Sequence, residues 1–581
     1  MPLFRRNAVT AAQSSTSNDN RQKNGKTKKH IAIIGSGVSG LTCAHYLVEE
    51  HDVTVFEAND YIGGHVNTID VALQDGRKSK SRFSKIRFSK KSQVEKSAID
   101  TGFIVFNERT YPNFFRLLHE LQVPFQSTDM SFSVKNVARN FEYNGHTINT
   151  LLSQRKNIIS PKFWRFVQDI LQFNKQMKQL RQDFEAARSN GEAVTRYTQQ
   201  TLSEYLASKR YGKLFTDNYL LPMVSAIWST SLEDVQDFPL VFFAQFFDNH
   251  GLLDVVNRPQ WFTIKGGSKQ YVNKLVTRFV KKGGQVRVNS PVQSVTRNRD
   301  NKAESTDAKV TLKMSNGKSI ESLDFDEVIF ACHADTALKI LQDATSDETE
   351  VLSHFRFTSN TAVLHTDTSV LPNKPLAWAS WNYLLDADGK TDNTVEQTSA
   401  KPVLTYHMNI LQRLTKQHNY LVTLNHKIDP AQIIKSIDYS HPVFDKPMIE
   451  AQKQWSTISS SGLHTHFCGA YWFNGFHEDG VRSGLRVCQS LGSQIDIKDE
   501  VDASHLPDGE SAHTPFVYKD IPVRADKSMH KLDNRQLLSA ETNQELLAYI
   551  ASIAAKPKVL TAAKTKKHGL LARVLHSSKH K

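Results

Sequence analysis

A chain of 581 residues is longer than one hydrophobic core normally organises, so at least two domains with a cleft between them are expected. Only 39% of the residues are apolar, and no run approaches the roughly eighteen apolar residues of a spanning helix. The cysteines Cys43, Cys332, Cys468 and Cys488 show neither a metal-ligand spacing nor a disulfide pattern. These features predict a cytoplasmic protein without a metal site.

The net charge of +14 is concentrated in three segments. Residues 1–29 carry +6, residues 77–97 carry +8 and residues 556–581 carry +8, which leaves −8 for the rest of the chain. Basic segments on an acidic body commonly meet polyanions, although charge runs are often only solvated. We expect segments 77–97 and 556–581 to bind an anionic membrane surface, so that the cytoplasmic protein would be peripheral at the membrane. Nucleic acid is the less favoured partner.

The first predicted elements form a βαβ unit. After a polar segment, 1–29, the apolar run His30–Ile34 is typical of a buried parallel strand, and the apolar spacing over Leu41–Val48 predicts a helix. Val53–Phe56 is the second strand. A strand pair is then predicted from Ile69–Leu73 and Ser97–Phe106, with its turn at Asp75-Gly76 lengthened by the basic insert 77–97.

Further along, a mainly helical stretch precedes two groups of strands. Predicted helices are Phe163–Arg181, Leu202–Leu214, Gly480–Leu491 and Arg535–Ala555. Further predicted strands are Gln285–Val288, Val292–Arg297, Val328–Ala331 and Thr465–Gly469. A second sheet that covers a substrate pocket is predicted from Val363–Val370 and Leu404–Leu411.

A glycine fingerprint lies between the first strand and the first helix, at Gly35-Ser36-Gly37-Val38-Ser39-Gly40. In this context the first glycine permits a tight turn, and the second lets backbone N–H groups approach a diphosphate at the helix N-terminus. The third allows the helix to pack closely on the strand. The motif therefore predicts a dinucleotide site.

Glu57 ends the second strand, where its carboxylate is placed to accept hydrogen bonds from a ribose 2′-hydroxyl. A carboxylate there argues against NADP, because it would repel the extra phosphate.

The residues that follow resemble the flavin amine oxidase and phytoene desaturase superfamily. The carrying motifs are Glu57-Ala58 followed by Gly63-Gly64-His65 and Thr68, then Gly266-Gly267, Ser290-Pro291-Val292, Cys468-Gly469, and Glu478-Asp479-Gly480-Val481 with Arg482-Ser483-Gly484-Leu485. These motifs extend over about residues 30–493. The resemblance implies an α/β fold, with a Rossmann-like FAD-binding domain of the glutathione reductase type, an interleaved α+β substrate domain and a helical subdomain.

The resemblance also implies FAD as the cofactor and a set of binding residues. The set is Gly35, Ser36, Gly37, Ser39, Gly40, Glu57, Ala58, Gly63, Gly64, His65, Thr68, Thr101, Gly102, Phe103, Val292, Gly469, Asp479, Gly480 and Val481.

Two departures argue against simple amine oxidation. His65 stands where amine oxidases usually have arginine, and Ala470 where many have an acidic residue. The chain is closer to predicted NAD/FAD-binding proteins associated with cyclopropane fatty acid synthase-like lipid modification. The segments Asp100–Pro112, Phe247–Gly251, Trp378–Tyr383 and Gly475–Gly480 carry that likeness. It implies a hydrophobic, lipid-like substrate.

No catalytic side chain is obligatory, because a flavin itself accepts the hydride. Three hypotheses stay open: a desaturase or dehydrogenase of a lipid-like substrate, a flavin amine oxidase, and a non-redox isomerase or membrane-surface binding module. His250, His365 and His477 are further candidates for an acid or base, although a lone histidine is more often structural. Candidate substrate-pocket residues are Tyr111, Trp228, Trp261, Trp381, Tyr383, Tyr406 and His407.

These patterns divide the chain into interleaved segments. The FAD-binding domain is predicted from three of them, 30–110, 265–335 and 460–493. The substrate and helical parts are 111–264 and 336–459, and the polar ends are 1–29 and 494–581.

Overall fold

The computed structural model describes residues 22–23, 26–74, 94–228, 238–254, 258–297, 309–315, 319–385, 403–414, 418–460 and 462–498. Most of the segment 1–29, the turn Asp75-Gly76, residues 77–93 of the insert, the helix predicted at Arg535–Ala555 and the segment 556–581 lie outside these ranges. Within the predicted tail 1–29, a short strand β1 (Gln22–Lys23) pairs with β2 (Lys26–Thr27).

A five-stranded parallel sheet is assembled from three separate stretches of the chain. Its order is β12-β4-β3-β16-β22, and every pairing is parallel. The strand β3 is almost wholly buried, as expected when helices or strands cover both faces of a sheet. The strands are β3 (His30–Ile34), β4 (Asp52–Phe56), β12 (Gln285–Arg287), β16 (Glu327–Phe330) and β22 (Thr465–Phe467). The predicted Rossmann-like α/β fold is confirmed.

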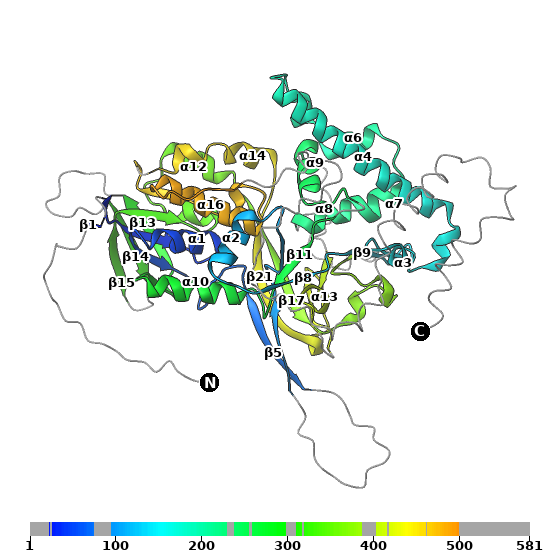
Figure 1. The fold of residues 1–581 in the computed structure, drawn as a ribbon, viewed down its shortest axis with the longest axis horizontal. Coiled ribbons are helices and arrows are strands. Elements are labelled where there is room, and N and C mark those ends of the chain that lie inside the picture. Colours follow the sequence, from blue (N-terminus) through cyan, green and yellow to red (C-terminus); the bar gives the residue numbers. More distant parts are fainter. Residues whose placement is uncertain are drawn as a thin grey trace, which may run out of the picture.

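Three helices cover one face of this sheet, with α1 between the other two (Figure 1). They are α1 (Val38–Leu47), α10 (Lys269–Lys281) and α16 (His477–Ser490). A small antiparallel sheet contacts β3 and consists of β13 (Val292–Arg297), β14 (Val310–Ser315) and β15 (Ile320–Phe325). The connection from β16 continues into α11 (Ala334–Ile340) and α12 (Ser346–Ser353).

A second, larger sheet has seven strands in the order β10-β9-β18-β19-β20-β17-β21. Only the pairing of β9 with β18 is parallel. The strands are β9 (Phe132–Asn136), β10 (Phe141–Asn144), β17 (Phe357–His365), β18 (Trp381–Leu385), β19 (Val403–His407), β20 (Leu421–Leu424) and β21 (Ile433–Pro442). The strand predicted at Leu404–Leu411 is wrong in its second half, because the chain turns there into α13 (Met408–Leu411). The helices α14 (Lys446–Gln452) and α15 (Trp455–Ile458) lead back to β22.

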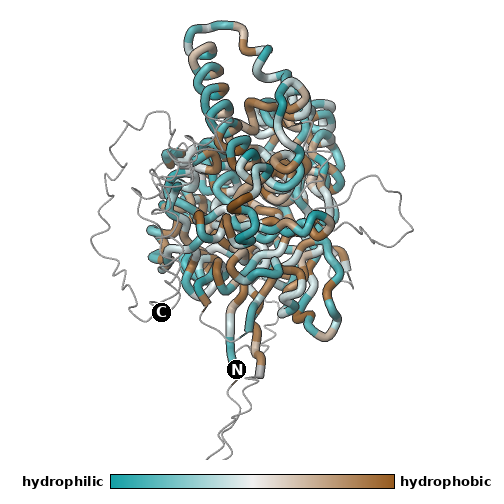
Figure 2. The backbone as a smooth tube through the Cα atoms, turned by 90° about the vertical axis from the view of Figure 1, so that its right-hand side faces the viewer, coloured by the Kyte–Doolittle hydropathy of each residue, from teal (hydrophilic) through white to brown (hydrophobic). Residues whose placement is uncertain are grey.

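A helical part adjoins this sheet. Its longest helix projects from the body, and the projecting end carries many hydrophilic residues (Figure 2). The helices are α3 (Ile148–Leu151), α4 (Pro161–Ser189), α5 (Thr195–Gln199), α6 (Leu202–Ser208), α7 (Lys213–Phe215), α8 (Leu221–Trp228) and α9 (Leu240–Asn249). A single helix over Leu202–Leu214 is a wrong prediction. The chain breaks there because the Gly212 N–H donates to the Asp169 carboxylate of α4, 2.9 Å away, at the start of α7.

A two-stranded hairpin extends away from the body (Figure 1) and consists of β5 (Thr68–Gln74) and β6 (Val94–Asp100). The strand predicted at Ser97–Phe106 is therefore wrong at both ends, because the observed strand β6 begins three residues earlier, at Val94, and already ends at Asp100. The next strand, β7 (Val105–Asn107), belongs instead to a sheet with β11 (Trp261–Ile264) and β8 (Phe125–Thr128). Helix α2 (Pro112–Glu120) follows β7. In the described part of the chain, no helix combines the length and the apolarity that crossing a bilayer requires.

Candidate functional site

A cavity of about 990 Å³ lies where the parallel sheet meets the seven-stranded sheet. Its wall contains the turn between β3 and α1, the ends of β4 and β16, and the segment after β6. The opposite wall comes from β18, β19 and β21 together with α8 and α9. The site thus lies at the carboxyl ends of the parallel strands, where open α/β sheets bind their ligands.

The three fingerprint glycines have different surroundings. A Cβ atom at Gly35, whose φ is +109°, would lie 2.6 Å from the Ala331 carbonyl oxygen, and one at Gly40 would lie 2.2 Å from the Gly35 oxygen. Gly37 has a φ of −65°, and a Cβ there would have no atom within 4 Å. Gly35 and Gly40 are therefore required by packing, whereas Gly37 leaves space open in the cavity wall.

Glu57 holds the fingerprint loop in place. One carboxylate oxygen accepts hydrogen bonds from the backbone N–H and the hydroxyl of Ser36, at 3.0 and 2.6 Å. The other accepts from the backbone N–H and the side-chain amide of Asn59, both at 2.9 Å. The side chain is buried and still lines the cavity. Glu57 therefore anchors the turn as well as standing where a ribose would bind.

Asp100 joins the hairpin to the domain behind it. Its buried carboxylate accepts hydrogen bonds from the Thr68 hydroxyl, from the Ser268 N–H and hydroxyl, and from the Gln412 amide. Burial raises the pKa of Asp100 to about 6. Because Asp100 is fixed, the next residues, Thr101, Gly102 and Phe103, are held in the cavity wall.

The start of α16 lies beside that segment. The rings of Phe103 and His477 are stacked with centroids 3.6 Å apart, and His477 Nε2 lies 2.8 Å from the Tyr271 hydroxyl. Both rings line the cavity. The Glu478 carboxylate accepts hydrogen bonds from the N–H groups of Asn113 and Phe114, and so joins the first turns of α16 and α2.

Most, but not all, of the predicted cofactor residues line the cavity. Those that line it are Gly35, Ser36, Gly37, Ser39, Glu57, Ala58, Gly63, Gly64, His65, Thr101, Gly102, Phe103, Val292 and Gly469.

The remaining five predicted cofactor residues lie behind the wall. Gly40 packs on the Gly35 oxygen, and Thr68 is bonded to Asp100. Asp479 caps its own helix by accepting from the Phe476 N–H. A Cβ at Gly480 would meet Val38, and Val481 is buried in the core against α2.

The aromatic candidates divide in the same way. Tyr111, Trp228, Trp261, Trp381 and Tyr406 line the cavity, and Trp381 is paired with Tyr406 across β18 and β19. Tyr383 and His407 do not line this cavity. Tyr383 is buried with its hydroxyl 3.4 Å from the Ser225 hydroxyl, and His407, one residue after Tyr406 on its strand, has its ring 5.6 Å from that of Trp378. Alternation along a strand sends His407 to the face opposite Tyr406.

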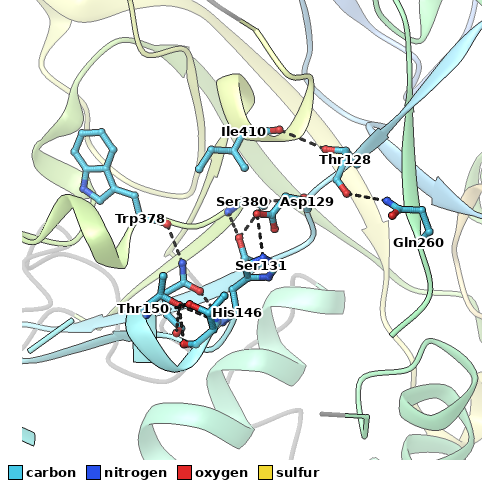
Figure 3. Close-up of polar contacts among 11 residues, drawn as sticks. Thr128, Asp129, Ser131, His146, Thr150, Gln260, Trp378, Ser380 and Ile410 are labelled. Atoms are coloured by element: carbon cyan, nitrogen blue, oxygen red, sulfur yellow. Dashed lines mark hydrogen bonds and ion pairs between the residues drawn. The ribbon is translucent and has the colours of Figure 1, made fainter. Parts of the chain in front are cut away.

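Hydrogen bonds fix the wall where β8 leads into β9 (Figure 3). The Ser380 hydroxyl donates to the Asp129 carbonyl oxygen at 2.7 Å, and the Ser380 N–H donates to the Ser131 hydroxyl at 3.0 Å. The Thr128 hydroxyl donates to the Leu411 carbonyl oxygen at 2.5 Å. These bonds hold Met130, Ser131 and Phe132 in the cavity wall.

Charge is scarce around the cavity. Among the described residues that line it, Glu57 is the only acidic side chain and Lys339 the only lysine or arginine. Burial lowers the pKa of each of the five lining histidines, to about 3 for His65 and about 4 for His250 and His441. The pKa values of His333 and His477 are lowered for the same reason. The five imidazoles are therefore neutral near pH 7.

Sequence reasoning missed His333 and His441. His333 follows the buried strand β16 in the sequence Cys332-His333-Ala334-Asp335, and the rule that ligands bind beyond the carboxyl ends of parallel strands could have found it. His441 lies on β21, at the edge of the other sheet, and no local pattern marks it.

Fold and site together define a dinucleotide-binding oxidoreductase. The family model for flavin-containing amine oxidoreductases matches residues 38–401. The chain therefore belongs to the flavin-containing amine oxidoreductase family and is an FAD-dependent enzyme.

Similar solved structures share the fold. A putrescine oxidase double mutant is 12% identical, with a TM-score of 0.52 over 80% of this chain and 99% of that one. A fatty acid isomerase from P. acnes is 14% identical, with a TM-score of 0.51 over 82% and 99% of the two chains. Cyclohexylamine oxidase from Brevibacterium oxydans is 15% identical, with a TM-score of 0.50 over 80% and 98%.

Curated relatives match only a short stretch. An L-amino acid oxidase from Lachesis muta is 51% identical over 41 residues, which are 7% of this chain and 8% of that protein. An L-amino-acid oxidase from Siganus canaliculatus is 51% identical over 43 residues, again 7% and 8%.

The residues present fit FAD. The open space at Gly37 lies at the N-terminus of α1, where a diphosphate would bind, and Glu57 is placed for the ribose. The same cavity, of about 990 Å³, is lined by Ser290, Pro291 and Val292 as well as by aromatic residues such as Trp261, and it therefore has room for a long cofactor. When bound, FAD supplies a hydride acceptor, and the chain's own residues position it and exclude water.

Proposed function

We propose that the protein is an FAD-dependent desaturase or dehydrogenase of a hydrophobic, lipid-like substrate. The aromatic lining of the cavity, in which charged side chains are scarce, carries this proposal. Tyr111, Trp228, Trp261, Trp381 and Tyr406 all line the cavity. A cationic amine would be buried there without a carboxylate among the described lining residues beyond Glu57, which stands at the ribose position.

The expected chemistry needs little from the protein beyond position. Apolar and aromatic side chains bury the alkyl part of a substrate, and the Asp100 network holds the segment Thr101–Phe103 against the same space. The five neutral histidines offer hydrogen bonds without a net charge.

Anaerobic reduction of the bound flavin tests the proposal. Long-chain acyl or alkenyl lipids are expected to bleach the flavin absorbance. Putrescine is expected to do so at least about 100-fold more slowly, because an unpaired ammonium is costly to bury. Faster bleaching by putrescine than by every lipid tested would favour the amine oxidase alternative. Double-bond migration in a lipid without flavin bleaching would favour an isomerase. This alternative is kept because a fatty acid isomerase has a similar fold.

A matched pair of variants localises the substrate. Trp381→Ala removes a lining ring and is expected to raise the KM for a reducing lipid about tenfold, by the loss of about 1–2 kcal/mol of apolar contact. Tyr383→Phe lies two residues along the same strand but outside the cavity wall, and it should leave KM unchanged. Equal effects of both variants would contradict the placement.

We also propose peripheral binding to anionic membranes through the insert 77–97. Residues Val94–Lys96 of this segment pair with Ala72–Gln74, so a deletion must spare them. Removing residues 77–93 is expected to leave FAD content intact and to flatten the salt dependence of binding to phosphatidylserine vesicles. The removed charges act over roughly 8 Å at physiological ionic strength. Undiminished vesicle sedimentation would move the assignment to residues 556–581.

A further inference from the structure

Two histidines are placed beside the first turn of α1 by close backbone contacts. A Cβ at Gly64 would lie 3.2 Å from the Gly37 Cα, which sets His65, the next residue, at the start of the helix. His333 is likewise two residues beyond Ala331, whose carbonyl oxygen packs on the turn before α1. Both imidazoles line the cavity.

A third imidazole reaches the same place from the other sheet. The ring centroid of His441 on β21 lies 5.5 Å from that of His65, and the Tyr439 ring stacks on His65 at 4.9 Å. The Asn360 amide nitrogen, a donor, lies 3.0 Å from His441 Nδ1. Neutral His441 therefore carries its proton on Nε2.

His65 has an unused hydrogen-bonding atom. Its Nε2 is buried and has no hydrogen-bond partner among the described residues. Burial, together with the neighbouring His441 and His333, lowers its pKa to about 3. A buried polar atom without a partner is costly unless a ligand satisfies it.

The charged and titratable groups that face this cluster are few. His65 acts on His477, Asp335 acts on His333, and Tyr439 stacks on His65. Glu57 and Lys339 also line the cavity, and Lys339 is the only lysine or arginine among the described lining residues. A dinucleotide diphosphate carries two negative charges, and the N-terminus of α1 supplies only a partial positive charge.

We propose that His65, His333 and His441 form the diphosphate-binding site for FAD, and that binding draws about one proton onto His65 and His333. His441 donates its Nε2–H without changing charge, because Asn360 already occupies Nδ1. An anion within about 4–6 Å favours the charged form of an imidazole. The inference concerns cofactor loading and is independent of the proposed substrate.

The direction of the pH effect follows from linkage. The two histidines bind more protons in the FAD complex than in the FAD-free protein, so affinity rises as pH falls. The logarithm of the FAD Kd is expected to increase by about 0.5 to 1 per pH unit between about pH 6 and 8. A site built on arginine would show no such slope, because arginine stays charged throughout this range.

Calorimetric titration in buffers of different ionisation enthalpy measures the proton directly. FAD and ADP-ribose, which share a doubly substituted diphosphate that does not itself titrate near pH 7, are expected to take up about 0.5 to 1 proton on binding. Adenosine, which lacks the diphosphate, should take up none. Binding of FAD and ADP-ribose without proton uptake would overturn the proposal.

Variants assign the proton to particular residues. His65→Gln with His333→Gln should lower FAD affinity at pH 6 about tenfold or more and abolish uptake, with folding checked by circular dichroism. His65→Arg should retain FAD and lose most of the pH slope. His250→Gln, at a lining histidine whose ring stacks on Phe246 and which no ring contact in the described part of the chain joins to the three-histidine cluster, is the matched control and should keep full uptake. Full uptake in the double variant, or its loss in the His250 control, would refute the assignment.

Discussion

Replacing Gly37 by valine is expected to abolish FAD retention while leaving the FAD-free fold intact. The backbone at Gly37 has φ −65° and ψ 177°, which any residue adopts, and a Cβ would meet no atom within 4 Å. The added side chain therefore occupies only the space in which the diphosphate would approach the helix N-terminus. We expect the Kd for FAD to rise at least about 1,000-fold, or about 4 kcal/mol.

The measurement is flavin content after purification, followed by titration of FAD-free protein. The unfolding free energy of the FAD-free variant should fall by no more than about 2 kcal/mol, because valine is a poorer N-cap residue than glycine but its side chain meets no other atom. Gly145→Val, at another uncrowded glycine outside the cavity, is the control and should keep wild-type flavin. Normal flavin content in a folded Gly37→Val protein would refute the cofactor position.

Replacing Glu57 by alanine is expected to affect both folding and cofactor binding. Four donors on Ser36 and Asn59 lose a charged acceptor, and the Ser36 N–H is buried. Hydrogen bonds to charged groups contribute about 1.5–3 kcal/mol each and are not additive, so a loss of about 2–4 kcal/mol in unfolding free energy is expected without FAD. The Kd for FAD should rise by about 100-fold, since the ribose contact and the ordered turn are lost together.

Glu57→Gln separates the two effects. A glutamine oxygen accepts from either Ser36 or Asn59, but its NH₂ group then faces the donors of the other residue. Its stability should therefore fall between those of the parent and the alanine variant. Urea unfolding of the FAD-free proteins measures this, and an unchanged unfolding free energy in Glu57→Ala would contradict the anchoring role.

The fingerprint could be predicted because its signals are local. A buried strand, three glycines and Glu57 lie within 28 residues, from His30 to Glu57, and each has a steric or hydrogen-bonding role that the spacing alone indicates. The five residues that lie behind the cavity wall show the limit of this reasoning. The polar side chains of Thr68 and Asp479 form hydrogen bonds with neighbouring protein groups and do not line the cavity. The local sequence pattern does not indicate which partner a polar side chain will bind.

The second sheet was harder to predict for a different reason. Whether a side chain of this sheet faces the cavity depends on the register of its strand and on which face of the sheet the rest of the protein covers. Trp381 and Tyr406 are paired across two strands and face inward, whereas His407 faces the opposite way after one step along the strand. The break before Gly212 likewise depends on Asp169, which is 43 residues away in the sequence.

By itself the sequence determined the parallel sheet, the dinucleotide turn and the acidic residue that anchors it, because these follow from short-range sterics and from burial on both faces of a strand. Only the tertiary structure decided the chemistry of the cavity. His65, His333 and His441 come from three distant segments, and their approach depends on glycine contacts around α1 and on the path of β21. The scarcity of charged side chains around the cavity also depends on which residues long-range packing brings together, and no single segment encodes it.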